Sequence, residues 1–377
     1  MIVEATVFTG ILYGVYELIS REPSDMSKIE KTFRNVKYGF GDKYPMRLYK
    51  RHYKNYSLYG FSVPYGLTDN TKLEILLSSA LNKPVKTELD GHLKVKVYRE
   101  DLPERMDYDF TKTKGWTVPI GHSLDRLELH DFDKIPHMTI AGMTRQGKTV
   151  LLKLIFAHLI DNHPDDVSFH IIDLKGGLEF NQYRNLTQVK SIASNVEEAR
   201  DNLTDILDEI KAEMQRFKSE NYTNVLDTPI KSRKFVIVDE GAELTPPSHC
   251  SREEKQTYQY CQQALSEIAR IAGALGYRLI FATQYPTSDT LPRQIKQNAD
   301  AKISFRLPTE VASRVAIDEQ GAEELNTVGR AIYRTADKHV VQVPYISDQD
   351  IKERLSEYVR AADEETPKRR TDFIEFG

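Results

Sequence analysis

Residues 137–160 read HMTIAGMTRQGKTVLLKLIFAHLI. A short apolar segment, Met138–Ala141, precedes a G-x-x-x-x-G-K-T loop, and a long apolar run follows it. A loop of this pattern between a strand and a buried helix is typical of proteins that bind nucleoside triphosphates. Its glycines allow the backbone to turn sharply and to approach a phosphate closely. The N–H groups of the loop and the positive end of the following helix then face the anion.

The loop and the first residues of the helix supply the predicted nucleotide site. Lys148 is expected to reach the β- and γ-phosphates, and Thr149 to bind Mg²⁺ through its hydroxyl. The alternative interpretation is a glycine turn with a solvated lysine. ATP and Mg²⁺ are therefore the predicted cofactors, and the predicted binding residues are Gly142, Met143, Thr144, Arg145, Gln146, Gly147, Lys148, Thr149 and Val150.

A second motif, KFVIVDE at residues 234–240, is an apolar strand that ends in two carboxylates. In phosphate-loop ATPases the aspartate at such a strand end helps to hold Mg²⁺, and a following glutamate can orient and deprotonate the attacking water. We therefore assign Asp239 to the metal and Glu240 to catalysis. Small-molecule kinases do not need a water-activating acid at this position, so the pair favours ATP hydrolysis.

From about residue 119, strand and helix patterns alternate, which predicts a mainly parallel sheet with helices on both faces. The segment 278–284, RLIFATQ, is expected to be a buried strand. Gln284 would then lie beside the γ-phosphate at the carboxyl edge of the sheet, where ligands bind in open α/β folds. The alternative is an ordinary loop glutamine.

The remaining patterns complete this α/β region. Ser194-x-x-Glu197 predicts a capping box at the start of a long amphipathic helix. A later helix has Cys261 on its apolar stripe, where we assign it to the core, and is expected to stop at Gly276 with a left-handed cap. Further strands of the sheet are predicted at residues 303–307, 331–334 and 340–343.

The first 118 residues are predicted to form a smaller N-terminal region. Between residues 28 and 54, nine lysines and arginines stand against two acidic residues, with four tyrosines interleaved. Such a segment can follow a nucleic-acid backbone and stack on bases, or it can be a solvated face. Residues 57–100 predict a small α+β unit with a hairpin at Asp90-Gly91, suited to assembly or partner binding. Residues 101–118 are interpreted as a connector.

Composition limits the class of protein. The 377 residues can hold one large and one small domain. Because 52 basic residues stand against 56 acidic ones, a polyanionic partner has to be held by a local basic surface. Two cysteines are too few for a disulfide framework and indicate a reducing compartment. No metal beyond Mg²⁺ is predicted, because no ligand spacing joins His122, His130, His137 and His158.

The start of the chain lacks the basic region of a signal peptide. The apolar segment 7–16 is too short to span a bilayer and is flanked by glutamates. We interpret it as a strand or a core helix, with peripheral membrane contact as the alternative. A cytoplasmic protein without an integral membrane span is expected.

With these motifs assembled, the chain resembles the FtsK/SpoIIIE family of hexameric double-stranded DNA translocases, and in particular its small members on mobile elements of Gram-positive bacteria. The likeness covers about residues 119–345. It rests on IPH at residues 135–137, IDLK at 172–175, VDE at 238–240, ATQYP at 282–286, and Ser313-Arg314 followed by QGAE at 320–323.

The resemblance implies a RecA-like P-loop NTPase of the ASCE class, with ATP at the subunit boundaries of a ring and DNA in its channel. By position, Arg314 would be the arginine finger that reaches a neighbour's γ-phosphate, with Arg306 as a second candidate. The expected organisation is an N-terminal region at 1–118, a motor domain at 119–346 and a charged, partly disordered tail at 347–377. Three features depart from the family: Arg145 and Gln146 replace small residues in the loop, Tyr285 replaces an arginine, and too few residues follow 345 for a DNA-reading winged helix.

The leading functional hypothesis is an ATP-driven pump for double-stranded DNA that assembles as a homo-hexamer. Mobile-element transfer or replication proteins are its implied partners. The first alternative is a coupling ATPase that passes single-stranded DNA or a nucleoprotein to a transfer channel. The second is a DNA-binding oligomer that uses ATP only to fix its oligomeric state.

Overall fold

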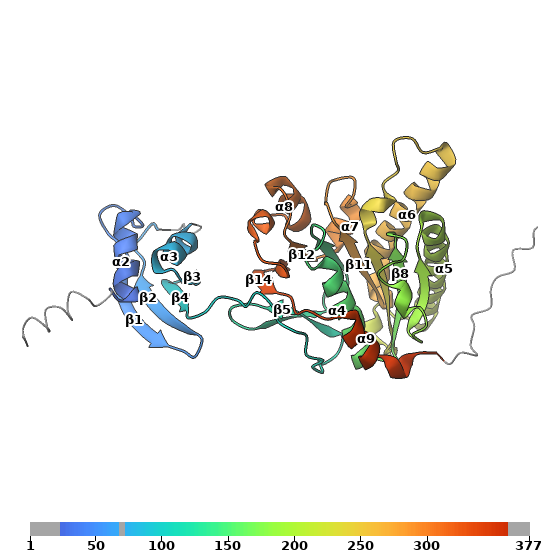
Figure 1. Cartoon of the computed structure of the whole chain (residues 1–377), viewed down its shortest axis with the longest axis horizontal. Helices are drawn as coiled ribbons and strands as arrows, with labels where there is room; N and C mark the ends of the chain where they lie inside the picture. The colour runs from blue at the N-terminus through green and yellow to red at the C-terminus, as the bar shows by residue number, and fades with distance from the viewer. Residues whose placement is uncertain (1–22, 68–71, 361–377) are drawn as a thin grey trace, which may run out of the picture. The chain divides into compact units, whose positions relative to one another are not determined.

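The computed structural model describes residues 23–67 and 72–360 of the 377-residue chain. It has two compact units, Met1–Asp101 and Leu102–Gly377 (Figure 1). Residues 102–118, which were predicted to belong to the N-terminal region, pack with the second unit in the structure. Tyr108 and Phe110 contact the apolar core of that unit, and Trp116 is buried in it. The apolar segment 7–16 and the last charged residues lie outside the described part.

In its described residues, the first unit has a four-stranded antiparallel sheet of order β1-β2-β4-β3 and two helices. Ile29 and Phe33 of the first helix and Leu77 of the second pack on Phe61 and Val95 of the sheet. The predicted hairpin is confirmed, and Gly91 at its turn has a φ of 67°, which favours glycine. The elements are α2 (Asp25–Asn35), β1 (Met46–His52), β2 (Tyr56–Ser62), α3 (Leu73–Leu81), β3 (Val85–Asp90) and β4 (His92–Tyr98).

The second unit is built on a ten-stranded sheet of order β6-β5-β14-β13-β12-β7-β11-β10-β8-β9. Its parallel part is β7 (Met138–Ala141), β8 (Val167–Asp173), β9 (Val189–Ala193), β10 (Arg233–Asp239), β11 (Tyr277–Thr283) and β12 (Ala301–Phe305). Its antiparallel part is β5 (Thr117–His122), β6 (Leu127–Asp131), β13 (Arg330–Arg334) and β14 (Lys338–Gln342). The predicted mainly parallel α/β sheet is confirmed. Strand β11 lies between β7, which precedes the glycine loop, and β10, which ends at Asp239.

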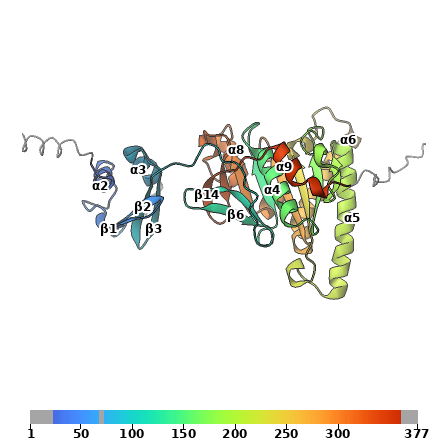
Figure 2. The ribbon, with the colours of Figure 1, turned by 60° about the horizontal axis from the view of Figure 1, so that its bottom comes forward.

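Helices cover both faces of this sheet, as predicted (Figures 1 and 2). Side chains alternate along β10 because successive residues of a strand point to opposite faces. Phe235 and Ile237 pack with α4 (Lys148–Asn162), whereas Val236 and Val238 pack with α5 (Val196–Glu220) and α6 (Arg252–Ile271). The helix α4 is apolar on nearly every side because it is buried along most of its length.

The helix ends differ slightly from the sequence predictions. Helix α5 is capped by Asn195, whose side chain accepts the N–H of Glu198, so the predicted cap at Ser194 is wrong by one residue. Helix α6 is followed by a 3-10 turn, Ala272–Leu275, and Gly276 then takes the predicted left-handed conformation with a φ of 90°. Cys261 is fully buried, as predicted.

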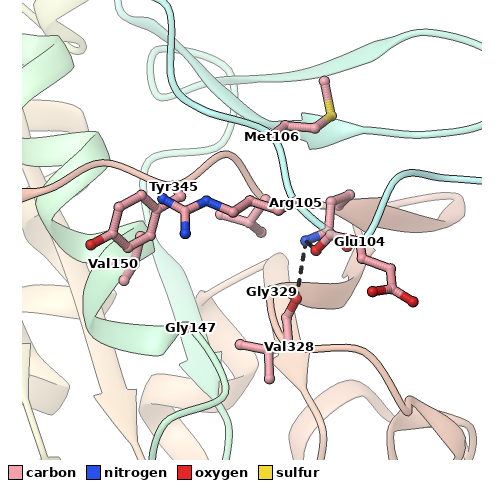
Figure 3. A pocket seen from close by; sticks show the side chains of 10 residues that line it. Glu104, Arg105, Met106, Gly147, Val150, Val328, Gly329 and Tyr345 are labelled. Carbon is pink, nitrogen blue, oxygen red and sulfur yellow. Dashed lines mark hydrogen bonds between the residues drawn. The ribbon is translucent and has the colours of Figure 1, made fainter.

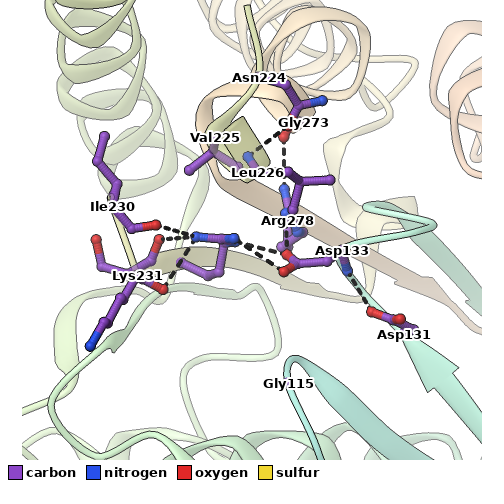
Figure 4. A network of polar contacts seen from close by, with 12 residues as sticks. Gly115, Asp131, Asp133, Asn224, Val225, Leu226, Ile230, Lys231, Gly273 and Arg278 are labelled. Atoms are coloured by element: carbon purple, nitrogen blue, oxygen red, sulfur yellow. Dashed lines mark hydrogen bonds and ion pairs between the residues drawn. The ribbon is translucent and has the colours of Figure 1, made fainter. Parts of the chain in front are cut away.

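A buried ionic network lies at the amino-terminal ends of β10 and β11 (Figure 4). Asp133 accepts hydrogen bonds from Arg233 at 2.8 and 3.1 Å and from Arg278 at 2.7 Å. Arg278 also donates to the carbonyl of Gly273. Because both guanidinium groups are buried, this carboxylate holds the loop after β6 against the starts of two central strands.

The described part of the chain ends on the second unit. Helix α9 (Asp348–Arg354) follows a capping box at Ser347, and Ile351 is buried in the core on the α4 face. Helix α8 (Glu310–Ile317) packs on the sheet near Ile332. Among the described residues, none of the helices is long and apolar enough to cross a membrane.

Candidate nucleotide site

The candidate site lies where the carboxyl ends of the central strands meet the start of α4. The strand register brings Asp239 opposite Asp173, and Thr283 opposite Ala141. All of these residues therefore stand at one edge of the sheet. The predicted loop residues, Asp239, Glu240 and Gln284 are thus brought to the same place by the parallel pairing.

The loop geometry explains its glycines. A Cβ on Gly142 would come within 2.6 Å of the Cβ of Phe305, and one on Gly147 within 2.9 Å of the same ring. Gly147 also has a φ of 115°. The side chain of Phe305 on β12 therefore leaves no room for a Cβ at either position. This requirement for glycine is separate from any need to approach a phosphate. Arg145 has a φ of 64°, an uncommon conformation for a residue with a side chain.

Lys148 lies at the centre of a buried charge cluster. Its Nζ is 2.8 Å from Asp239 Oδ1 and 3.2 Å from Glu240 Oε2. Lys175, after β8, places its Nζ 3.2 Å from the same oxygen of Glu240. The positive charges of Lys148 and Lys175 thus compensate the negative charges of Asp239 and Glu240.

Glu240 has an unfavourable backbone conformation. Its φ of 67° lies in the left-handed region, which is costly for a residue with a Cβ. Its Oε1 accepts a hydrogen bond from the N–H of Gln284 at 2.9 Å and one from the hydroxyl of Thr283 at 3.3 Å. Burial alone would raise the pKa of Glu240, but Lys148, the Gln284 N–H and Lys175 together lower it below its ordinary value. The carboxylate is therefore held ionised and oriented.

Two further carboxylate groups suit a hydrated divalent cation. Asp239 is fully buried, and among the described residues neither of its carboxylate oxygens accepts a hydrogen bond, although Oδ1 contacts Lys148. Burial raises the pKa of Asp173, and the nearby Asp239 adds to this rise. Among the described residues, Asp239 Oδ2 and Asp173 Oδ1 are buried without a hydrogen-bond donor, which fits the water ligands of Mg²⁺, a cation that binds through one or two carboxylates and keeps several waters. Thr149, at the start of α4, is the hydroxyl that could join Asp239.

Two hollows border these residues. A cleft of about 560 Å³ is lined by the loop, Lys148, Thr149, Gln284 and charged side chains that include Lys153 and Asp348. Beside it lies a smaller, mainly apolar hollow of about 270 Å³ (Figure 3). Together they have the dimensions and the mixed polar and apolar lining of a small-molecule site.

Of the remaining predicted residues, Gln284 lies against the loop, whereas Arg314 does not line the cleft. Thr144 donates to the Gln284 side chain at 3.2 Å, so Gln284 lies against the loop. Arg314 is on α8, where it donates to Glu310 of the same helix at 2.9 and 2.7 Å, and it does not line the cleft. Arg306 directly follows β12, and its carbonyl accepts the N–H of Met143 at 3.0 Å.

One part of the cleft was not predicted from the sequence. Lys153 is buried and bridges Glu179 and Asp348, each at 2.8 Å. The signal for it was a lysine within the otherwise apolar run of α4. Asp348 had no comparable signal, because α9 reaches the site only through tertiary packing.

Comparison with known proteins shows similarity to one protein family. Residues 109–234 match the FtsK/SpoIIIE family. The chain is 28% identical over 264 residues to the DNA translocase FtsK of Streptococcus pneumoniae, which covers 64% of this chain and 33% of that protein. The FtsK of Lactiplantibacillus plantarum is also 28% identical, over 262 residues. The chain thus spans about a third of the length of these curated relatives.

Solved structures share the fold. The ATPγS-bound monomer of the pCW3 conjugation coupling protein TcpA has a TM-score of 0.65 at 20% identity, covering 88% of this chain and 99% of that one. The cytoplasmic domain of the type VII secretion ATPase EccC from Thermomonospora curvata has a TM-score of 0.56 at 22% identity, covering 69% of this chain and 33% of that one. The predicted α/β fold of a phosphate-loop ATPase, with a small α+β region before it, is confirmed.

Proposed function

We propose that this chain, which carries an FtsK/SpoIIIE family domain at residues 109–234, is a DNA-stimulated ATPase that moves DNA. One observation carries the hydrolytic part of the proposal. Lys148, which lines the polar cleft, has its Nζ within 3.2 Å of a carboxylate oxygen of Asp239 and of Glu240. A phosphate-binding cation and a water-activating acid are thus within reach of a single triphosphate.

Each residue has a separate task in this reaction. The loop N–H groups and Lys148 bind the phosphates, so Lys148 exchanges its carboxylate partners for the nucleotide. Thr149 and Asp239 would hold Mg²⁺, which supplies charge neutralisation at the phosphates. Glu240, fixed by the Gln284 N–H and the Thr283 hydroxyl, takes a proton from the attacking water. Gln284, which accepts a hydrogen bond from Thr144 of the loop, would detect the γ-phosphate.

The DNA-moving part of the proposal is supported by the family match and by the names of the FtsK relatives. We propose double-stranded DNA as the substrate, a hexameric ring as the assembly and the cytoplasm as the location. Arg314 lies on an exposed helix face, where a neighbouring subunit could accept it. Its role in a neighbour's site is part of the same proposal.

The test compares the wild-type protein with Glu240→Gln. The wild type is expected to hydrolyse ATP faster with double-stranded DNA, and Glu240→Gln to lose hydrolysis while it still binds nucleotide. Electron microscopy with DNA and a slowly hydrolysed ATP analogue is expected to show a ring around a central channel. An ATPase rate that is indifferent to DNA would contradict the translocase, and DNA movement by Glu240→Gln would favour an ATP-switched binding oligomer.

A coupling ATPase for single-stranded DNA or nucleoprotein is the second candidate. The observation that favours it is the fold match with TcpA, which extends over 88% of this chain and almost all of that protein. Single-stranded DNA would then stimulate hydrolysis more than double-stranded DNA does. The opposite order supports the first candidate.

A further inference from the structure

Among the described residues, both helices of the first unit lie on the same face of its sheet (Figures 1 and 2). Tyr59 of β2 and Val95 of β4 point to that face and join the apolar core. Side chains alternate along a strand, and residues directly opposite one another in neighbouring strands share a face. The strand register therefore places a second set of side chains on the other face, which we call the open face. It includes Tyr49, Arg51, Tyr56, Lys86 and Lys96.

Tyrosine rings lie along the open face. The ring of Tyr49 crosses β2 at Gly60, where an added Cβ would come within 2.3 Å of it, and its hydroxyl forms a hydrogen bond with His92 of β4 at 2.7 Å. Tyr53, in the turn between β1 and β2, stacks on Tyr56 with ring centres 4.8 Å apart and 23° between the ring planes. Tyr53 is still 41% exposed. A stack that ends in an exposed ring can accept a further flat ring.

Cationic groups lie beside these rings. The guanidinium carbon of Arg51 is 5.1 Å from the ring centre of Tyr49, and the Nζ of Lys96 is 5.7 Å from the ring centre of Tyr56. Arg51 is also exposed to solvent. Aromatic rings with cations beside them can stack on bases and hold phosphates at the same time.

The charge of this region has the sign that a polyanion requires. Residues 23–101 contain fifteen lysines and arginines against nine acidic residues, whereas the whole chain has 52 against 56. On the open face, Glu88 and Asp90 of the edge strand β3 lie 3.4 and 3.2 Å from the Nζ of Lys94, which compensates them. Residues 46–62, which form β1, β2 and their turn, contain no acidic residue. This segment therefore supplies the local basic surface that a polyanion needs on an acidic chain.

We propose that the open face binds single-stranded DNA, with bases stacked on Tyr53 and phosphates held by Arg51 and Lys96. Unpaired bases can lie against an aromatic ring, whereas the bases of a duplex are enclosed by their neighbours. The rings and cations of β1 and β2 therefore fit a single strand better than a duplex. The site lies outside the nucleotide cleft and goes beyond the proposed function, and only the choice of DNA over RNA rests on that function.

The first experiment measures the binding of fluorescent oligothymidine to the full chain without ATP, by anisotropy. The double variant Arg51→Glu, Tyr53→Ala is expected to weaken binding by about tenfold or more, because it removes a stacking surface and reverses the charge at a phosphate contact. The matched control is Arg34→Glu with Tyr65→Ala, which is expected to bind like the wild type. Arg34 is exposed on α2 and Tyr65 is 99% exposed after β2, so neither belongs to the strands of the open face.

Two outcomes of this experiment would overturn the proposal. Equal affinities of the two double variants would show that the open face does not contribute to binding. Tighter binding of oligouridine RNA than of oligothymidine would assign the face to RNA instead of DNA.

The second experiment uses the wild-type chain and locates the contact directly. An oligothymidine strand with one 5-iododeoxyuridine, which cross-links on irradiation to an aromatic ring stacked on it, is expected to form an adduct with Tyr53. Excess unlabelled single strand is expected to remove this adduct more effectively than the same amount of duplex. Adducts confined to residues 102–377, or equal competition by duplex, would overturn the single-stranded site. Cross-linking at Tyr53 in a protein without ATPase activity would overturn the proposed function and leave this site standing.

Discussion

Lys148 and Asp239 form an ion pair that is almost completely buried, with Nζ 2.8 Å from Oδ1 and side-chain exposures of 4% and 0%. The lysine that is assigned to the phosphates therefore has a second task when no nucleotide is bound. Lys148 compensates the charge of Asp239, and Lys148 and Lys175 together compensate the charge of Glu240. In the proposed function, nucleotide binding would be an exchange of anions around Lys148, and the phosphates would offset the cost of separating the ion pair.

The first prediction concerns the stability of the nucleotide-free protein. Lys148→Met leaves Asp239 without its cation and is expected to lower the free energy of unfolding by about 3 kcal/mol. Urea denaturation followed by circular dichroism measures the change. Lys153→Met is the matched comparison on the same helix. Its partners Glu179 and Asp348 are 39% and 44% exposed, so water can solvate them and the loss is expected to be smaller. Equal losses in the two variants would contradict the prediction.

The second prediction concerns the pH dependence of hydrolysis. Burial opposes the ionisation of Glu240, but Lys148, the Gln284 N–H and Lys175 lower its pKa below the ordinary value of 4.5. In the free enzyme Glu240 is therefore ionised at all higher pH values, and kcat/KM for ATP, which reports the ionisation of the free enzyme, is expected to show no acid limb from Glu240 above pH 4.5. Lys175→Met removes one of the stabilising charges, so the acid limb is expected to move to higher pH.

The control for this pH profile is Lys190→Met on β9, because Lys190 bonds to the carbonyl of Thr187 and not to Glu240. Its profile is expected to match that of the wild type. An acid limb that stays in place in Lys175→Met would mean that another group limits the rate at low pH.

The third prediction concerns the ionic network at the opposite edge of the sheet. Burial alone would raise the pKa of Asp133, but Arg233 and Arg278 lower it below 3.8. Its stabilising contribution is therefore complete above pH 3.8 and is lost as the pH falls through the lowered value. Asp133→Asn leaves the buried guanidinium of Arg278 without an anion, so at pH 7 it is expected to lower the free energy of unfolding by about 3 kcal/mol.

Thermal and urea denaturation of Asp133→Asn at pH 7 test this expectation, with Asp208→Asn as the control. Asp208 forms a solvent-exposed pair with Lys211, whose loss is expected to leave the stability nearly unchanged. ATP affinity is expected to remain that of the wild type in both variants, because Asp133 lies at the amino-terminal ends of the strands. A stable Asp133→Asn protein would show that the arginines find other partners.

The central strands and the motif residues could be predicted because their signals are local. Met138–Ala141 is a continuous apolar segment before a glycine loop, and it forms β7 with those bounds. The cap of α5 was placed one residue too early because Ser194 and Asn195 are both good caps, and the pattern cannot choose between neighbours. The role of Phe305 beneath the loop and the position of residues 104–106 beside it depend on contacts between distant segments. No periodicity in those segments indicates such contacts.

The last prediction concerns Arg314, which the single chain holds against its own helix. Its guanidinium donates twice to Glu310 and once to Gln320, so it has to leave these exposed partners before it can reach another subunit. Exposed pairs of this kind are worth less than about 1 kcal/mol, so the exchange costs little. Arg314→Ala is therefore expected to abolish DNA-stimulated hydrolysis without changing ATP affinity.

Mixing variants separates action on a neighbour from action within one chain. Arg314→Ala subunits keep an intact Glu240, and Glu240→Gln subunits keep an intact Arg314. If the arginine acts across the boundary, the two inactive proteins are expected to recover part of the ATPase rate when they assemble together. The same mixture with Arg306→Ala tests the second candidate, whose carbonyl already bonds to the loop of its own chain. Recovery with Arg306→Ala and none with Arg314→Ala would transfer the role to Arg306, because only a residue supplied by the neighbour can be restored in this way.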